Sequence, residues 1–265
     1  MLLALAYVSA GFLAFPPQVQ VGAVSAVQIS EKRHEIYVLH RGTPPLAVFS
    51  DKGAFLRAWG EGLFKVPHGL RISPDGNLWL TDNQTSEVRK FSPEGKLLLT
   101  LDAKLKSPDD LVFDTKGNMY VADAGNARIV KFGADLKQVK TWGKKGKADG
   151  EFNLAHSLSI DKQDRIYVGD RGNNRVQVFD SEGGFVRAIT GFGNPFGVLA
   201  AGDTLFVAEG EKHKLFAYSL DGAMQTSWGN PAELKLPHLM AMSRKGVLYV
   251  SEVDGKRVQM FRRKK

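Results

Sequence analysis

Apolar and polar positions recur along the chain in one order: a short apolar strand, a tight turn, an alternating second strand that ends in an acidic residue, and a third strand. Three copies match almost position by position: LRISPDGNLWLTDNQTSEVRKF from Leu70, LVFDTKGNMYVADAGNARIVKF from Leu111 and LSIDKQDRIYVGDRGNNRVQVF from Leu158. When apolar and polar residues alternate, successive side chains lie on opposite faces of a strand, and turns such as PDGN close hairpins. The pattern therefore predicts repeated antiparallel hairpins.

Three further copies follow the same order: VLAAGDTLFVAEGEKHKLFAY from Val198, MAMSRKGVLYVSEVDGKRVQMF from Met240, and a degenerate first copy, VQISEKRHEIYVLHRG, from Val27. The second strand ends, in chain order, at His40, Asp82, Asp123, Asp170, Glu209 and Glu252. These positions are 42, 41, 47, 39 and 43 residues apart, which is the period of a four-stranded propeller blade. The sequence therefore predicts an all-β fold, a single six-bladed β-propeller.

The last copy stops at Phe261, before a basic tail, and so lacks a fourth strand. A propeller closes its ring to avoid an exposed sheet edge, and the missing strand then has to come from the other end of the chain. We expect the segment around residues 18–21 to supply it.

Residues 2–15 form a near-continuous apolar run. A run of about 14 residues is short for a membrane span and is typical of the apolar region of an export signal. An uncleaved anchor and a buried strand are the alternatives. We therefore expect residues 1–17 to be a signal peptide or N-terminal apolar segment and residues 18–265 to be the propeller. A secreted or periplasmic protein follows, without a stable membrane span after signal removal.

The composition limits which metal sites and which partners are possible. The chain has no cysteine, so disulfides and thiolate metal sites are excluded, and any metal must be held by His, Asp or Glu. The net charge of +8 could suit a nucleic acid or an anionic surface. The basic residues are spread over all segments apart from the C-terminal tail, and export separates the protein from most nucleic acid. We therefore expect a solvated cationic surface and no nucleic-acid partner.

Copies of a repeat occupy rotationally equivalent places, so one position compared across blades reports what gathers around the axis. The position just before the first apolar strand is, in blade order, Ser25, His68, Asp109, His156, Phe196 and His238. Histidines from alternate blades would converge from three directions, as the ligands of a catalytic zinc site do. Each of them taken alone could instead be a loop histidine that bonds to the backbone.

The position after the strand-end acid is Arg41, Asn83, Ala124, Arg171, Gly210 and Val253. The two arginines come from facing blades and would lie on the same rim as the histidines, where guanidinium groups suit a carboxylate. Pairing of each arginine with a surface acid is the alternative. The acids Asp82, Asp123 and Asp170 are expected to tie down the following loop by accepting backbone N–H groups, and not to act in catalysis.

The motifs PHGLRISPDGNLWLTD, AHSL with VGDRGNNRVQVF, and LPH with LYVSE resemble the NHL repeats of peptidyl-α-hydroxyglycine α-amidating lyases, over most of residues 27–261. The resemblance implies zinc bound by His68, His156 and His238, with Arg41 and Arg171 in the active site. It also implies cleavage of a carbinolamide C–N bond, which releases a peptide amide and glyoxylate.

The chain departs from that family's pattern in three places. Ala124 and Gly125 stand where the resemblance calls for the catalytic tyrosine, and Asp109 is then the nearest substitute base or additional metal ligand, with a turn aspartate as its alternative role. Leu239 replaces the acid that the resemblance associates with structural calcium, which argues against calcium. The family's disulfides are absent.

Three functions stay open. The first is a zinc-dependent, lyase-like or hydrolytic enzyme with a small-molecule or peptide substrate that carries a carboxylate. The second is a non-catalytic NHL-repeat scaffold in the cell envelope that binds a peptide or glycan. The third, an RNA-binding NHL domain, is disfavoured by the export signal and by the shortage of aromatic residues in the loops.

Overall fold

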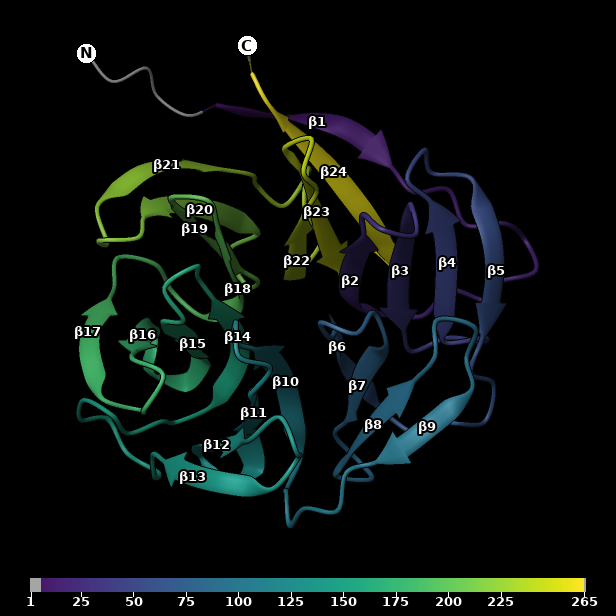
Figure 1. Cartoon of the computed structure of the whole chain (residues 1–265). Coiled ribbons are helices and arrows are strands. Elements are labelled where there is room, and N and C mark those ends of the chain that lie inside the picture. Colours follow the sequence, from purple (N-terminus) through teal and green to yellow (C-terminus); the bar gives the residue numbers. More distant parts are fainter. Residues whose placement is uncertain (1–5, 265) are drawn as a thin grey trace.

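The structure, a computed structural model that describes residues 6–264, consists of six four-stranded antiparallel sheets. The sheets are arranged as blades around a central axis (Figure 1), which confirms the predicted six-bladed β-propeller. Two single turns of 3-10 helix, η1 (Ala124–Asn126) and η2 (Arg171–Asn173), are the helical segments within residues 6–264. Neither has the length that a membrane span requires.

The strands follow the repeat. Blade one contains β2 (Val24–Ser30), β3 (Glu35–His40), β4 (Leu46–Ser50) and β5 (Phe55–Trp59), and blade two contains β6 (Pro67–Ile72), β7 (Leu78–Asp82), β8 (Glu87–Phe91) and β9 (Leu97–Thr100). Blade three contains β10 (Pro108–Phe113), β11 (Met119–Asp123), β12 (Arg128–Phe132) and β13 (Gln138–Trp142), and blade four contains β14 (Ala155–Ile160), β15 (Ile166–Asp170), β16 (Arg175–Phe179) and β17 (Phe185–Ile189). Blade five contains β18 (Pro195–Ala201), β19 (Thr204–Glu209), β20 (Lys214–Ser219) and β21 (Met224–Trp228). Blade six contains β22 (Pro237–Met242), β23 (Val247–Glu252), β24 (Arg257–Arg263) and β1 (Tyr7–Phe12).

The core lies between neighbouring blades. One buried cluster, for example, joins Tyr120 of blade three to Leu158 and Phe179 of blade four. Alternation along each strand supplies these apolar faces, and the first hairpin turn is closed by glycines such as Gly76, whose φ of 85° favours glycine. The first strands of adjacent blades contact one another and line the axis. Side chains at their ends are thus fixed by rigid sheets.

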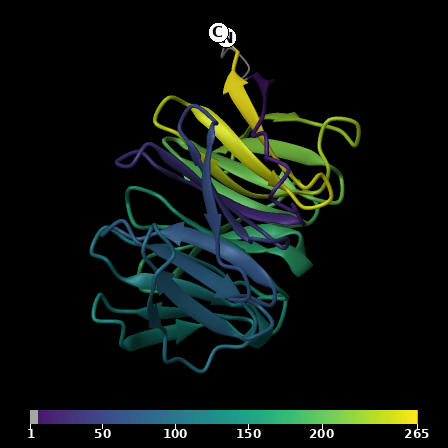
Figure 2. The same ribbon diagram turned by 90° about the vertical axis from the view of Figure 1, so that its right-hand side faces the viewer.

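Ring closure differs from the sequence-based expectation. The strand that completes blade six is β1, which pairs antiparallel with β24 from Tyr7↔Arg263 to Phe12↔Gln259. The expectation that residues 18–21 supply this strand was wrong, because Gln20 forms only an isolated bridge to Thr43. Figure 1 shows β1 beside β24, and in Figure 2 these two strands, purple and yellow, again lie next to each other.

Packing explains why the earlier segment closes the ring. The Tyr7 ring stacks on Trp228 with centroids 4.6 Å apart, and Leu13 is 3% exposed in the cluster between blades six and one. The signal-peptide interpretation of residues 1–17 stays a prediction, and its first five residues lie outside the described part of the chain. Removal of the whole segment would take β1 away from blade six.

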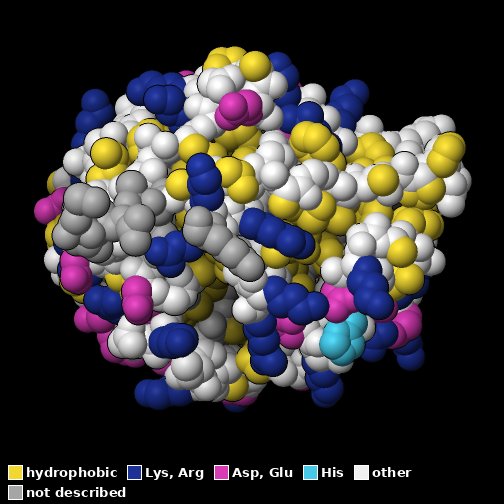
Figure 3. Space-filling model, turned by 90° about the horizontal axis from the view of Figure 1, so that it is seen from above, with side chains coloured by type: hydrophobic (Ala, Val, Ile, Leu, Met, Phe, Trp, Pro, Cys, Tyr) yellow, Lys and Arg dark blue, Asp and Glu magenta, His cyan; other side chains and the backbone are white. Residues whose placement is uncertain are grey.

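Charged side chains are dispersed on the side of the molecule seen in Figure 3. Lysine and arginine lie there singly among acidic and apolar groups instead of forming one continuous basic surface. This distribution agrees with the even spread of basic residues along the sequence.

Candidate metal centre

The three predicted histidines meet on the axis. His68, His156 and His238 are each the second residue of the first strand in blades two, four and six. Their ring centroids are 4.8, 4.9 and 5.0 Å apart, and one nitrogen from each ring lies within 4.8 Å of the other two. All three side chains are buried, at 3–4% exposure. The predicted convergence of the three histidines from alternate blades is thereby confirmed.

An irregularity of the sheet turns these side chains inward. In blade two the register of β6 against β7 shifts between Pro67 and Leu70, and the corresponding shift occurs at His156 and His238 in blades four and six. A β-bulge of this kind re-aims a side chain relative to the regular pleat. The repeat therefore directs each imidazole at the axis instead of into the space between blades.

The backbone of the next blade fixes each ring. Nδ1 of His68 donates to the Asp109 carbonyl oxygen at 2.8 Å, Nδ1 of His156 to the Phe196 carbonyl at 2.7 Å, and Nδ1 of His238 to the Ser25 carbonyl at 2.6 Å. A carbonyl oxygen only accepts, so each Nδ1 carries the proton and each Nε2 keeps its lone pair. Three such acceptors converge at one point, which is the donor set and the outer-shell arrangement that a metal ion requires.

The protonation state of the trio suits a metal as well. Burial lowers the pKa of His68 to about 4, against a weaker opposing effect of its bond to Asp109. Burial also lowers the pKa of His156 and His238 well below the ordinary value, and the neighbouring histidines and arginines add to this. Neutral imidazole is the form that coordinates metals. The residues present therefore fit a metal ion held by three histidines.

Arg41 and Arg171 lie on the same rim. Each directly follows a second strand whose last residue pairs with the start of the first, His40 with Val24 in blade one and Asp170 with Ala155 in blade four. Burial lowers the pKa of both guanidinium groups, and Asp109 acts against it in both cases.

Asp109 occupies the axial position of blade three and is 6% exposed. Asn83 Nδ2 donates to its Oδ1 and also to the Pro108 carbonyl oxygen at 3.2 Å. Burial raises the pKa of Asp109 to about 7, while the Asn83 bond and the two arginines lower it and Asp110 raises it. Sequence reasoning missed the role of Asn83, although Asn83 stands at the same repeat position as Arg41 and Arg171.

The three strand-end aspartates accept backbone N–H groups as expected, but within residues 6–264 only Asp82 accepts them from the loop that follows, at Gln84 and Thr85; all three acids also hold the loop before the first strand of the blade. Asp82 accepts the backbone N–H of Lys65 at 2.6 Å, Asp123 that of Lys106 at 2.7 Å, and Asp170 that of Asn153 at 2.9 Å. In blade one His40 substitutes for the acid, and its Nδ1 accepts the Gly42 N–H at 3.0 Å. The loops that carry the rim arginines are held by the His40 contact in blade one and, in blade four, by Asn173 Nδ2, which donates to Asp170 at 2.8 Å.

The loop of blade three has no room for the tyrosine that the family resemblance calls for. A Cβ at Gly125 would lie 2.7 Å from the Lys106 carbonyl oxygen, so η1 passes directly against the neighbouring loop. Ala124, at the preceding position, is buried. The close packing of the backbone at these two positions therefore leaves no space for a tyrosine side chain.

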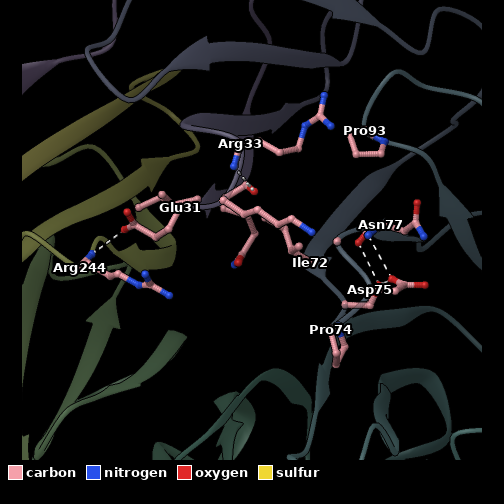
Figure 4. Close-up of a pocket in the computed structure, with 14 residues that line it drawn as sticks. Glu31, Arg33, Ile72, Pro74, Asp75, Asn77, Pro93 and Arg244 are labelled. Atoms are coloured by element: carbon pink, nitrogen blue, oxygen red, sulfur yellow. Dashed lines mark hydrogen bonds between the residues drawn. The ribbon is translucent and has the colours of Figure 1, made fainter.

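A hollow of about 560 Å³ lies at the other end of the first strands (Figure 4). Two acceptors near it are occupied: the backbone N–H of Arg244 donates to Glu31 at 2.6 Å, and the Arg33 guanidinium pairs with Glu35 at 2.8 Å. It contains none of the predicted site residues. The candidate chemistry therefore belongs to the histidine end of the axis.

Comparison with known proteins agrees with this architecture. A sequence model of the NHL repeat matches residues 152–179. The chain is 31% identical to NHL repeat-containing protein 3 of Mus musculus, covering 91% of this chain and 79% of the relative. It is 31% identical to peptidyl-alpha-hydroxyglycine alpha-amidating lyase 2 of Drosophila melanogaster, covering 84% of this chain and 58% of the relative.

Among solved structures, virginiamycin B lyase from Staphylococcus aureus superimposes with a TM-score of 0.68 at 15% identity, covering 97% of this chain and 84% of that one. At this identity the likeness concerns the fold alone.

Proposed function

The chain belongs to the family of NHL-repeat proteins, and from this premise we propose that it is a zinc-dependent, lyase-like enzyme. Its substrate is a small molecule or peptide that carries a carboxylate, of the peptidyl-α-hydroxyglycine kind. The reaction takes place at the histidine end of the central axis. The similarity to an amidating lyase over 84% of this chain supports the reaction class.

One observation carries the proposal. Three buried imidazoles donate their Nδ1 protons to carbonyls of the next blade, so three Nε2 lone pairs point at one place. Three unpartnered acceptors at such separations repel one another, and a cation between them removes the repulsion. A purely structural role would not require the same arrangement in three alternate blades.

Zinc bound by His68, His156 and His238 would supply a Lewis acid that makes a substrate hydroxyl easier to deprotonate. Arg41 binds the substrate carboxylate, because a guanidinium donates two parallel hydrogen bonds to two carboxylate oxygens. Asp109 is the carboxyl group of the axial position and takes the base role that the absent tyrosine leaves open. Asn83 holds the Asp109 carboxyl in place.

The bonds of the proposed step balance without an external oxidant. Asp109 accepts the hydroxyl proton, and the O–H electron pair becomes the second bond of the new carbonyl group. The C–N bond breaks, its electron pair stays on the amide nitrogen, and that nitrogen receives the proton from Asp109. The products are an amide and glyoxylate.

A second candidate function is a non-catalytic scaffold that binds a peptide or glycan in the cell envelope. The observation that favours it is the loop at Ala124 and Gly125, which has no space for a phenol. The same rim and the same metal centre would then bind a ligand without turnover.

Incubation of zinc-loaded protein with an α-hydroxyglycine peptide separates the two candidates. The enzyme releases glyoxylate, and His156→Ala abolishes the release, whereas His34→Ala, at an exposed histidine away from the axis, does not. Glyoxylate at the uncatalysed rate, with the peptide bound to the zinc-loaded protein, would support the scaffold.

Localisation is part of the proposal. The apolar segment at residues 2–15 supports export to the periplasm or the medium. The partner is then a small molecule or peptide, and not a nucleic acid.

A further inference from the structure

The two rim arginines approach the metal centre from opposite sides. Arg41 belongs to blade one and Arg171 to blade four, and in a closed ring of six blades these two face each other across the axis. Both guanidinium groups act electrostatically on His68 and His238. One arginine is enough to bind one carboxylate. The proposed reaction uses Arg41 for this and gives Arg171 no role.

Neither of these arginines forms an ion pair with an acid in the described part of the chain, and this distinguishes them from other arginines on the same rim. Those others are neutralised by strand-end acids: Arg128 pairs with Asp123 at 2.6 Å, Arg175 with Asp170 at 2.9 Å and Arg257 with Glu252 at 3.0 Å. Among the described residues, acids act on the two rim arginines only from beyond ion-pair distance: Asp109 and Asp82 on Arg41, and Glu211 and Asp109 on Arg171, while the Asp109 carboxyl accepts its side-chain hydrogen bond from Asn83.

Arg171 is held in position for a ligand. Its guanidinium carbon lies 3.6 Å from the centre of the Phe196 ring, and its Nε donates to Asn194 Oδ1 at 3.1 Å. The Phe196 ring in turn packs at 5.6 Å from the His156 ring. Stacking and one hydrogen bond fix the plane of the guanidinium, while its two terminal nitrogens make no hydrogen bond within residues 6–264.

Arg41 is fixed at its backbone and free at its tip. Its N–H donates to the Ala23 carbonyl oxygen at 2.9 Å, and the next residue, Gly42, donates to His40. A Cβ at Gly42 would lie 1.8 Å from the Gln20 carbonyl oxygen, so the loop admits no larger residue there. The Arg41 side chain therefore extends from a tightly held loop, and its guanidinium group makes no hydrogen bond within residues 6–264.

We propose that the substrate carries two anionic groups, one on each side of the hydroxyl that meets the metal, and that Arg41 and Arg171 each bind one of them. Neither guanidinium group has an acid of the described chain within ion-pair distance, and a ligand with two carboxylates gives each of them a directly hydrogen-bonded counter-charge. This inference rests on the proposed function and specifies its substrate class: a hydroxy-dicarboxylate, or a hydroxyglycine peptide with an acidic residue beside it.

Malate and lactate provide a matched pair of probes, because both are α-hydroxy acids and only malate has a second carboxylate. Titration calorimetry of the zinc-loaded protein measures both affinities, with metal analysis afterwards to verify that zinc is retained. We expect malate to bind at least about tenfold more tightly, equivalent to about 1.4 kcal/mol. Arg171→Gln lowers the malate affinity to about that of lactate, and the exposed Arg244→Gln at the other end of the axis changes neither affinity.

Equal affinities of malate and lactate in the wild-type protein would overturn the inference, and the proposed function would survive if glyoxylate were still released from an α-hydroxyglycine peptide. A preference for malate that persists in both Arg41→Gln and Arg171→Gln would overturn it too. Failure to bind zinc would instead remove the proposed function, and the same comparison on the metal-free protein would still test the paired arginines.

Discussion

Substitution of Leu13 tests whether the N-terminal segment closes the ring. Leu13 follows β1 directly, its N–H donates to the Val258 carbonyl oxygen at 3.1 Å, and its side chain is 3% exposed. It packs in the cluster that joins blades six and one, with Val27 and Phe49 among its members. Leu13→Ala removes three carbon atoms from that cluster and leaves a cavity.

The expected loss follows from this burial. Leucine-to-alanine changes in packed cores lower the free energy of unfolding by about 2–5 kcal/mol. The matched control is Val8→Ala on β1 itself, where the side chain is 47% exposed and the loss should stay within about 0.5 kcal/mol. Deletion of residues 1–13 removes the β1–β24 pairing in addition and should cost more than Leu13→Ala.

Urea denaturation followed by tryptophan fluorescence measures these differences, because Trp228 stacks on Tyr7 of the same strand. With a slope of about 3 kcal/mol per molar urea, the Leu13→Ala midpoint should fall by roughly 1 M. If Leu13→Ala and Val8→Ala had the same midpoint, the segment would not be packed as the closing strand. An exported protein that begins after residue 17 and is as stable as the full chain would likewise show that β1 is not needed to close the ring.

Three further outcomes follow from buried charges. Asp109→Asn should lower glyoxylate release by about 10²–10⁴-fold while zinc content stays unchanged, as kinetics and metal analysis of one preparation would show. Arg71→Met leaves the buried Asp110 carboxylate without its cation and should lower the free energy of unfolding, measured in urea, by about 3–5 kcal/mol. Lys137→Met, which breaks an exposed ion pair, is the control, and a smaller loss in Arg71→Met than in Lys137→Met would contradict the expectation. Burial opposes ionisation of Glu35, but hydrogen bonds that include two arginines lower its pKa from 4.5 to about 2. This stabilisation is complete above pH 4.5 and lost as the pH falls towards 2, so Glu35→Gln should show a weaker acid dependence of unfolding.

The blades were predictable from sequence because their signals are local. Each hairpin has its own alternation and its own turn residues, and the spacing of the strand-end residues, such as Asp82 and Asp123, reports the blade period directly. The convergence of His68, His156 and His238 was predictable for the same reason, since rotational equivalence converts a repeat position into a place in space.

The closing strand was not predictable in this way. The apolar run at residues 2–15 looks the same whether it is an export signal or a strand, and its partner β24 lies about 250 residues away in sequence. Tyr7 of this strand stacks on Trp228 of blade five, and no local pattern encodes a contact between residues so far apart.

Contacts between blades were missed too. The Asn83 bond to Asp109 and the Phe196 platform beneath Arg171 both join residues of neighbouring blades, and a repeat pattern shows only which positions are equivalent. Deviations from the repeat, such as asparagine at the position of the arginines, were the available signal.

Whether the three histidines hold zinc can be measured by metal analysis with mass spectrometry on gently purified protein, with wild type, His156→Ala and the exposed-histidine control His34→Ala prepared side by side. We expect about one equivalent of zinc in the wild type and in the control, and loss of the metal in His156→Ala. Less than about half an equivalent in the wild type, or equal zinc in all three proteins, would contradict the three-histidine centre.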